Sequence, residues 1–476
     1  MGTIQVARRL SPWLFWGLLL TLVLTLRLLG ADTRGIWQDE GLTLYQVRLP
    51  VAEILANRIP VAQFNTQNTV PPFYFLLLGG WGRLVGYGLW SLRLFSIFCS
   101  LLIGLLLYAV GRWMAGPRVG RMAALLAALS PLYLWYAQEL RMYTFLLIPA
   151  TLSMGLLWRW QQETRPALQW RWALAYGLTA AAMAWTHYLA FLLIGAQMVW
   201  LVLVLLRRAP RFFLIALGFF FLLALPLIPF GIRRLLAGQE RDFFFQPLES
   251  IVGNLMHSLA FGPPFFVSRL EEIAWLLPLA WALLGLGLWQ AWRRGRWPLA
   301  LLLGTTLILP VLLIYALSFV KPLYQNARHL IVVSPAFYLL WALGLQRLAE
   351  LRRWLPLLVL PLLAYGWGLS FQHYYSNDGD VVQKNDLRPL FEYMAEHYVP
   401  GDVVALNDPV LQHTLEYFAP GVPWTILPGY AEPITAERTI PLYEQVAQQY
   451  ERVWYVYGPP DSSFDTWRHV YDWFHG

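Results

Sequence analysis

Long apolar segments separated by short polar ones dominate the first 371 residues. Crossing a bilayer as a helix takes about 17–25 such residues. Eleven segments are long enough, near residues 12–30, 90–110, 121–138, 141–158, 172–187, 188–206, 212–230, 274–292, 298–319, 330–346 and 354–371. The pattern predicts a polytopic α-helical membrane protein with 11 transmembrane helices, or up to 13 if segment 72–88 and a neighbour also cross.

Every second connection between these segments carries a cluster of arginines. The clusters are Arg112, Arg118 and Arg121; Arg159, Arg165 and Arg171; Arg207, Arg208 and Arg211; Arg293, Arg294 and Arg296; and Arg347, Arg352 and Arg353. Loops rich in arginine stay on the cytoplasmic side. We therefore expect these loops and the N-terminus to be cytoplasmic, in a multi-pass protein of the inner or plasma membrane.

Segment 72–88 is apolar enough to be counted as another span, but it contains five glycines and Arg83. Counting it as a span would also place the cluster from Arg112 to Arg121 on the outer side. We therefore interpret 72–88 as an interfacial helix, within a first outer loop formed by residues 31–89.

The pattern changes after residue 371. Short apolar segments at 401–407, 422–428 and 452–458 alternate with amphipathic ones at 387–398, 409–418 and 440–450. Alternation of strands and helices is typical of a mostly parallel sheet. The sequence thus predicts a transmembrane domain at 1–371 and a small extracytoplasmic α/β domain at 372–476.

Composition supports a membrane location. The chain is 58% apolar and only 13% charged, which is too apolar for a soluble globule. Its net charge of +8 comes almost wholly from arginine. Because the arginines lie in short clusters between apolar segments, they indicate membrane topology, and we expect no nucleic-acid partner. Cys99 is the only cysteine, which excludes disulfides within the chain.

Ionisable residues gather at the predicted outer ends of the spans. They are Arg27, Asp39, Glu40, Arg93, Glu139, Arg141, His187, Arg328 and His329. Charged residues beside membrane spans are candidates for function. Structural roles are the alternative: arginines such as Arg27 can extend to the lipid headgroups, and Glu139 and Arg141 can form a pair that closes a turn.

As a set, these residues combine carboxylates that can act as a base with arginines that can hold phosphate oxygens. A lipid-phosphate substrate fits this set, since its phosphate lies at headgroup depth. A transporter or flippase would instead show internal repeats and polar sites near the middle of the membrane. A membrane scaffold without enzymatic activity would need no such layer of charges.

Several of these residues lie in short motifs that follow one another in a familiar order. The motifs are "WQDE", "VPPFYFLLLGGWGRLVG", "LWSLRLFSIF", "SPLYLWYAQELRMYTFLL", "THYLAFL" and "NARHLIVVSP". Over residues 10–345 the chain resembles bacterial membrane glycosyltransferases of the GT-C superfamily, in particular the protein O-mannosyltransferase-like group and the lipid A aminoarabinose transferases.

The resemblance implies a sugar donor linked to polyprenyl phosphate. It also implies that Asp39 is the general base with Glu40 beside it, that Glu139 and Arg141 line the donor pocket, and that Arg328 meets the donor phosphate. The predicted set is completed by Arg93 and His329 near the phosphate and by Tyr143 and His187 in the substrate pocket. The chain departs from the family at His329, where tyrosine is usual, and at Val70, where many relatives have histidine or lysine.

The chemistry of such a transfer needs a base on the acceptor hydroxyl and stabilisation of the leaving phosphate. A single base opposite the leaving group gives inversion at the anomeric carbon. Arginines can stabilise the phosphate. The sequence leaves open whether a divalent cation also serves as a cofactor. A polysaccharide polymerase or ligase that uses the same class of donor is the nearest alternative. The sugar stays open, and so does the acceptor, which can be a protein, a lipid glycan or a cell-wall polymer.

Overall fold

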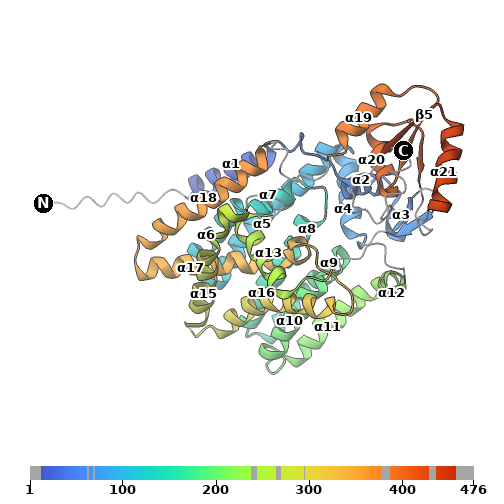
Figure 1. The fold of residues 1–476 in the computed structure, drawn as a ribbon. Coiled ribbons are helices and arrows are strands. Elements are labelled where there is room, and N and C mark those ends of the chain that lie inside the picture. Colours follow the sequence, from blue (N-terminus) through green and yellow to red (C-terminus); the bar gives the residue numbers. More distant parts are fainter. Residues whose placement is uncertain are drawn as a thin grey trace. The chain divides into compact units, whose positions relative to one another are not determined.

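The computed structural model describes residues 12–61, 64–67, 70–236, 244–263, 270–293, 295–376, 386–427 and 436–456 (Figure 1). The chain divides into two compact units. Unit 1 comprises Met1–Asp32, Arg93–Pro229 and Phe243–Val381, and unit 2 comprises Thr33–Leu92, Phe230–Asp242 and Val382–Gly476. Unit 2 thus groups most of the predicted first outer loop with the C-terminal segment, although the sequence pattern predicts separate domains for the two.

Unit 1 is helical throughout its described residues. Its helices are α1 (Pro12–Leu28), α5 (Leu89–Ala115, which begins in unit 2), α6 (Pro117–Ala128), α7 (Pro131–Ala137), α8 (Tyr143–Gln162), α9 (Pro166–Thr186), α10 (Ala190–Val204), α11 (Pro210–Ala224), η1 (Leu225–Leu227), α12 (Ile228–Leu236, which ends in unit 2), α13 (Leu248–Phe261), α14 (Leu270–Ala274), α15 (Leu277–Arg293), α16 (Trp297–Ser318), η3 (Ala327–Val333), α17 (Ser334–Leu351) and α18 (Leu355–Tyr375).

Six helical stretches among the described residues are long and apolar enough to cross a membrane. They begin at Leu89, Pro210, Glu272, Trp297, Ala327 and Leu355. Large apolar side chains point outward from them, such as Leu222 at 65% and Leu357 at 67% exposure. Apolar surface of this extent is stable in lipid. The protein is therefore a multi-pass helical membrane protein, while the count of eleven spans stays a prediction.

The predicted span at 121–138 is not one helix. It is divided between α6 and α7 at Ser130 and Pro131. Proline lacks the N–H that would continue the helical hydrogen bonds. The Ser130 hydroxyl instead caps α7 by accepting a hydrogen bond from the Tyr133 N–H at 3.1 Å. The segment predicted as one span therefore consists of two helices, and the break lies at a proline that the sequence itself marks as a helix breaker.

Unit 2 combines a helical part with a small sheet. The first part contains α2 (Gln38–Gln46), α3 (Val51–Ala56), the hairpin of β1 (Arg58–Val61) and β2 (Phe64–Gln67), and α4 (Phe73–Val85). The C-terminal part contains α19 (Arg388–His397), β3 (Asp402–Leu406), η4 (Pro409–Leu411), α20 (Gln412–Phe418), β4 (Trp424–Ile426), α21 (Ala436–Gln449) and β5 (Arg452–Val456). At 13 residues, α4 is shorter than a membrane span.

The three C-terminal strands form a parallel sheet in the order β4-β3-β5, and each lies within a segment that the sequence predicted as a strand. All five residues of the central strand β3 are buried. Asp402 at its start accepts hydrogen bonds from Arg452 Nε at 3.0 Å and from Arg452 Nη2 at 2.6 Å on β5. These bonds hold the pKa of the Asp402 carboxyl well below its ordinary value. The pair thus ties β3 to β5.

Candidate active site

The two predicted catalytic acids belong to unit 2. Asp39 and Glu40 occupy the first turn of α2, where the helix dipole favours negative charge. The two side chains differ in access: Glu40 is fully buried at 0% exposure, whereas Asp39 is half-buried. The Thr43 hydroxyl donates to the Asp39 carbonyl at 2.9 Å. Of the two carboxylates, Asp39 is therefore the one that an incoming molecule can reach.

Helix α2 packs closely against α20 from the C-terminal part of unit 2. Gly41 makes this approach possible, because a Cβ at that position would lie 2.9 Å from Thr414 Cβ and 3.2 Å from Thr414 Cα. Four residues further along α2, the Tyr45 ring stacks on His413 with centroids 4.1 Å apart. The helix that carries the acids is thus held by side chains about 370 positions later in the chain.

The segment before α2 is held by the same part of unit 2. The Leu387 N–H donates to the Ile36 carbonyl at 3.0 Å, and the Ile36 N–H donates to Asp386 Oδ1 at 3.1 Å. Arg388 Nη2 donates to the Arg34 carbonyl at 2.9 Å. Contacts on both sides of the acids therefore fix the backbone from which Asp39 projects.

The second group of predicted site residues belongs to unit 1. Glu139 and Arg141 lie in the turn between α7 and α8 and are 2% and 5% exposed. The Ser96 hydroxyl donates to the Glu139 carbonyl at 2.8 Å. Arg93 on α5 is fully buried, and its Nη1 donates to the Ala31 carbonyl at 2.8 Å. Burying such charges is costly in a membrane protein, which favours a functional reason for keeping them.

Tyr143 and His187 lie near this turn. Tyr143 begins α8, and its ring centroid is 6.3 Å from that of His187, which follows α9. The Tyr136 ring on α7 packs edge-on against Tyr143 at 4.9 Å. The Leu189 N–H donates to His187 Nδ1 at 3.1 Å. Because Nδ1 accepts this bond, the neutral ring carries its proton on Nε2.

Arg328 and His329 lie in η3, which packs against α8. Asn326 caps η3 by accepting a hydrogen bond from the Arg328 N–H at 3.1 Å, and the guanidinium Nη2 donates to Gln325 Oε1 at 2.7 Å. His329 Nδ1 accepts from the Gln325 N–H at 3.0 Å. The local bonds therefore orient both side chains of this pair.

Electrostatic interactions connect these segments of unit 1. The Tyr136 hydroxyl interacts electrostatically with Glu139, Tyr143 and Arg328. The His329 ring interacts in the same way with His187. The predicted residues of the α7–α8 turn, the α9–α10 turn and η3 thus gather in one region of unit 1. Tyr136 belongs to this region but was not predicted, because an aromatic residue inside an apolar helix gives no distinguishing signal.

Arg27 has a structural role. It is 1% exposed, and its guanidinium donates to Ser100 Oγ at 2.8 Å, to the Ala128 carbonyl at 2.9 Å and to the Ala127 carbonyl at 3.1 Å. These bonds tie α1 to α5 and α6. The interpretation that Arg27 extends to the lipid headgroups was therefore wrong, since the protein itself satisfies the charge.

The described residues can be searched for side chains that would hold a metal cofactor. Among the described residues, no group of three or more His, Cys, Asp or Glu side chains is placed to hold a metal ion.

Comparison with known proteins gives matches to one family model and to several solved membrane glycosyltransferases. Residues 69–230 match the family model for dolichyl-phosphate-mannose-protein mannosyltransferase. Among solved structures, the chain is similar to ArnT from Cupriavidus metallidurans bound to undecaprenyl phosphate, with a TM-score of 0.59 and 16% identity over 92% of this chain and 91% of that one. None of the curated proteins matches the sequence.

The chain is also similar to the oligosaccharyltransferase of Archaeoglobus fulgidus, crystallised with Zn and sulfate. The TM-score is 0.54 and the identity is 15%, over 86% of this chain and 62% of that one. Together with the family match, these similarities confirm the resemblance to the GT-C superfamily and to the lipid A aminoarabinose transferase group.

Proposed function

From its GT-C fold, we propose that the protein is a membrane glycosyltransferase that takes a sugar from a polyprenyl-phosphate donor and transfers it to an acceptor hydroxyl at the outer face of the membrane. One observation carries the proposal. A fold similar to that of ArnT over 92% of the chain brings the buried Glu139 and Arg141 and the half-buried Arg328 into one region of its helical unit.

Arg141 and Arg328 are proposed to bind the donor phosphate. A guanidinium presents several N–H groups in a planar fork that suits phosphate oxygens. His329 and His187 lie in the same region of unit 1, where each accepts a backbone N–H at Nδ1; we assign His329 a place near the phosphate and His187 a place in the substrate pocket. We assign Arg93 a supporting part, because its burial and its bond to Ala31 limit it to acting through its charge.

Asp39 is proposed to be the general base. It takes the proton from the acceptor hydroxyl while the acceptor oxygen forms a bond to the anomeric carbon. The bond from that carbon to the phosphate oxygen breaks, and polyprenyl phosphate leaves with the electron pair, stabilised by the arginines. One displacement of this kind inverts the anomeric configuration. Glu40, being fully buried, supports the orientation of Asp39.

The similarity to an archaeal oligosaccharyltransferase favours one alternative within the same chemistry. The donor can carry an oligosaccharide, in which case the protein acts as a ligase for a longer glycan. The proposed roles of Asp39, Arg141 and Arg328 are the same in both cases, since the phosphate and the acceptor hydroxyl are unchanged. The two functions differ in the size of the group transferred.

The proposal can be tested with purified full-length protein in lipid nanodiscs. The protein is given polyprenyl-phosphate donors with different labelled monosaccharides and, in parallel, a labelled lipid-linked oligosaccharide, together with membrane extract as acceptor. We expect transfer from at least one donor and none from the matching nucleotide sugars. Transfer of the oligosaccharide alone would favour the ligase. Transport of intact donor between leaflets, with no transfer from any donor, would contradict the proposal.

A further inference from the structure

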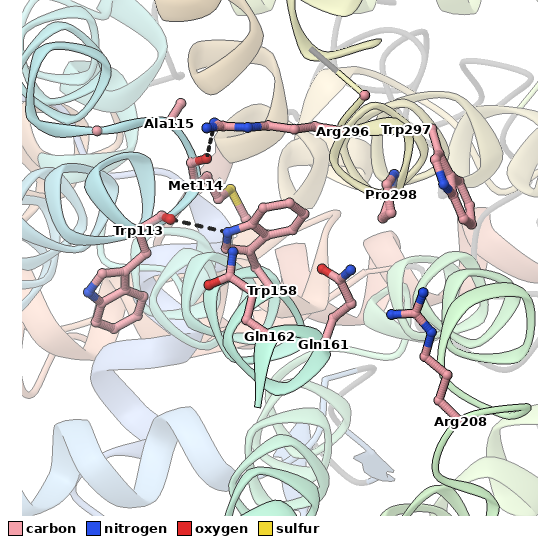
Figure 2. Close-up of a pocket in the computed structure, with 12 residues that line it drawn as sticks. Trp113, Met114, Ala115, Trp158, Gln161, Gln162, Arg208, Arg296, Trp297 and Pro298 are labelled. Carbon is pink, nitrogen blue, oxygen red and sulfur yellow. Dashed lines mark hydrogen bonds between the residues drawn. The ribbon is translucent and has the colours of Figure 1, made fainter. Parts of the chain in front are cut away.

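A pocket of about 480 Å³ lies in unit 1 where four connections between helices meet (Figure 2). Its walls come from the end of α5, the end of α8, the turn before α11 and the start of α16. None of the residues proposed for glycosyl transfer lines it. All four connections carry the arginine clusters that the predicted topology places on the cytoplasmic side, opposite to the predicted layer of catalytic residues.

Hydrogen bonds hold the walls of this pocket in place. Trp158 is 4% exposed, and its Nε1–H donates to the Trp113 carbonyl at 3.1 Å. Arg296 Nη1 donates to the Met114 carbonyl at 3.1 Å, which connects α16 to α5 (Figure 2). The Arg159 guanidinium lies 5.9 Å from the centroid of the Trp113 ring. The pocket is thus formed by the folded protein before any ligand enters.

The lining is basic and polar. Arg208 and Arg296 supply two positive charges, Gln161 and Gln162 supply amides, and no acidic residue is among the lining residues. Figure 2 shows the Arg208 side chain extending into this region on the same side as the Gln161 amide. Gln161 Oε1 is buried and accepts no hydrogen bond within the described residues. A buried acceptor of this kind calls for a donor from a ligand or from water.

The residues that line the pocket indicate where its ligand comes from. Tryptophan is enriched at the level of the lipid headgroups, and Trp113, Trp158 and Trp297 all line the pocket. Pro298 lies in the first turn of α16, so the positive end of this 22-residue helix adds to the charge of the arginines. Basic pockets between membrane helices on the cytoplasmic side bind anionic lipid headgroups.

We propose that this pocket binds the headgroup of an anionic glycerophospholipid from the cytoplasmic leaflet. The phosphodiester lies against the guanidinium group of Arg208, a headgroup hydroxyl donates to the neighbouring Gln161 Oε1, and Arg296 adds positive charge to the pocket. A glycerol headgroup supplies both groups, whereas a choline headgroup has no hydroxyl and adds a positive charge. This site is independent of the proposed glycosyl transfer.

The test measures lipid retention by native mass spectrometry of the full-length protein released from detergent. The samples contain phosphatidylglycerol, phosphatidylcholine or inorganic phosphate. The variants are Arg208→Gln, Gln161→Leu and the control Arg207→Gln, which removes the same charge one residue away from the pocket lining. We expect wild type to retain phosphatidylglycerol at least about tenfold better than phosphatidylcholine. Retention should fall at least about fivefold in Arg208→Gln and in Gln161→Leu, and by less than twofold in Arg207→Gln.

Other outcomes would overturn the proposal. Equal loss in Arg207→Gln and Arg208→Gln would indicate attraction by the net charge of the loop instead of a built site. Displacement of the lipid by inorganic phosphate at similar concentration would assign the pocket to free phosphate. Retention unchanged in both pocket variants would show that the lipid binds elsewhere. Thermal unfolding of each variant, measured in parallel, identifies any variant that fails to fold, and Gln162→Leu then replaces it.

Discussion

Replacing Gly41 by alanine should disturb the helix that carries the proposed base. The added methyl group would collide with Thr414 Oγ1 and would lie 2.9 Å from Thr414 Cβ. Rotation of the threonine side chain can move Oγ1 but neither Cβ nor Cα, and Cα is only 3.2 Å away. Because Thr414 is itself fully buried, α2 and α20 must move apart.

Two opposing contributions set the size of the effect. Alanine in place of glycine within a helix is favourable by about 0.5–1 kcal/mol. Inserting a methyl group into a well-packed contact costs about 1–3 kcal/mol. The net result is a destabilisation of unit 2 by roughly 0–2.5 kcal/mol, with a central value of about 1 kcal/mol. Gly80 provides a matched control, because it lies in α4 of the same unit and a methyl group added there would have nothing within 4 Å.

Thermal unfolding and transfer turnover are measured for Gly41→Ala, Gly80→Ala, Thr414→Ala and the double variant Gly41→Ala/Thr414→Ala. We expect Gly41→Ala to unfold at lower temperature and to transfer more slowly with donor binding unchanged, whereas Gly80→Ala is neutral or slightly stabilised. The double variant should recover part of the loss, with a coupling of at least about 0.5 kcal/mol. If Gly41→Ala is as stable and as active as Gly80→Ala, the packing of α2 on α20 does not position Asp39.

Three further predictions concern the donor, the sheet and the topology. Arg328→Ala should weaken donor binding at least about tenfold, while Arg165→Ala, a charge removed from an exposed position, leaves it unchanged; equal binding in both would make Arg328 structural. Asp402→Asn should lower the unfolding temperature of unit 2 at neutral pH. Because the pKa of Asp402 is depressed in the folded state, its contribution is present above the ordinary carboxyl pKa and is lost as the pH falls toward the folded value, so the variant and wild type should converge in acid. In intact cells, Arg118→Cys should be shielded from an impermeant thiol reagent and Glu396→Cys should react; the reverse labelling would invert the proposed topology.

Local signals in the sequence sufficed for much of the fold. The three C-terminal strands and the helices between them follow from the alternation of short apolar and amphipathic segments. The positions of Asp39 and Glu40 after the first span made them candidates for the base, and that assignment stays a prediction. The break near residue 130 was indicated by Pro131, which cannot continue a helix.

Other features depend on contacts between distant parts of the chain. Arg27 has the same sequence context whether it reaches lipid or protein, and its acceptors lie 73 to 101 residues away. The contact between Gly41 and Thr414 joins two short helices that have no motif in common. The pocket around Trp158 is likewise assembled from four loops, each of which alone indicates only topology.

The most direct test of the account is the transfer rate of Asp39→Asn at saturating donor. Asparagine keeps the shape of the side chain but cannot take the acceptor proton, so transfer should fall by about 10²–10⁴-fold, while donor affinity stays within about twofold of wild type. Glu40→Gln, which alters the buried neighbour, should lose less. Transfer by Asp39→Asn within about threefold of wild type would contradict the assignment of Asp39 as the general base.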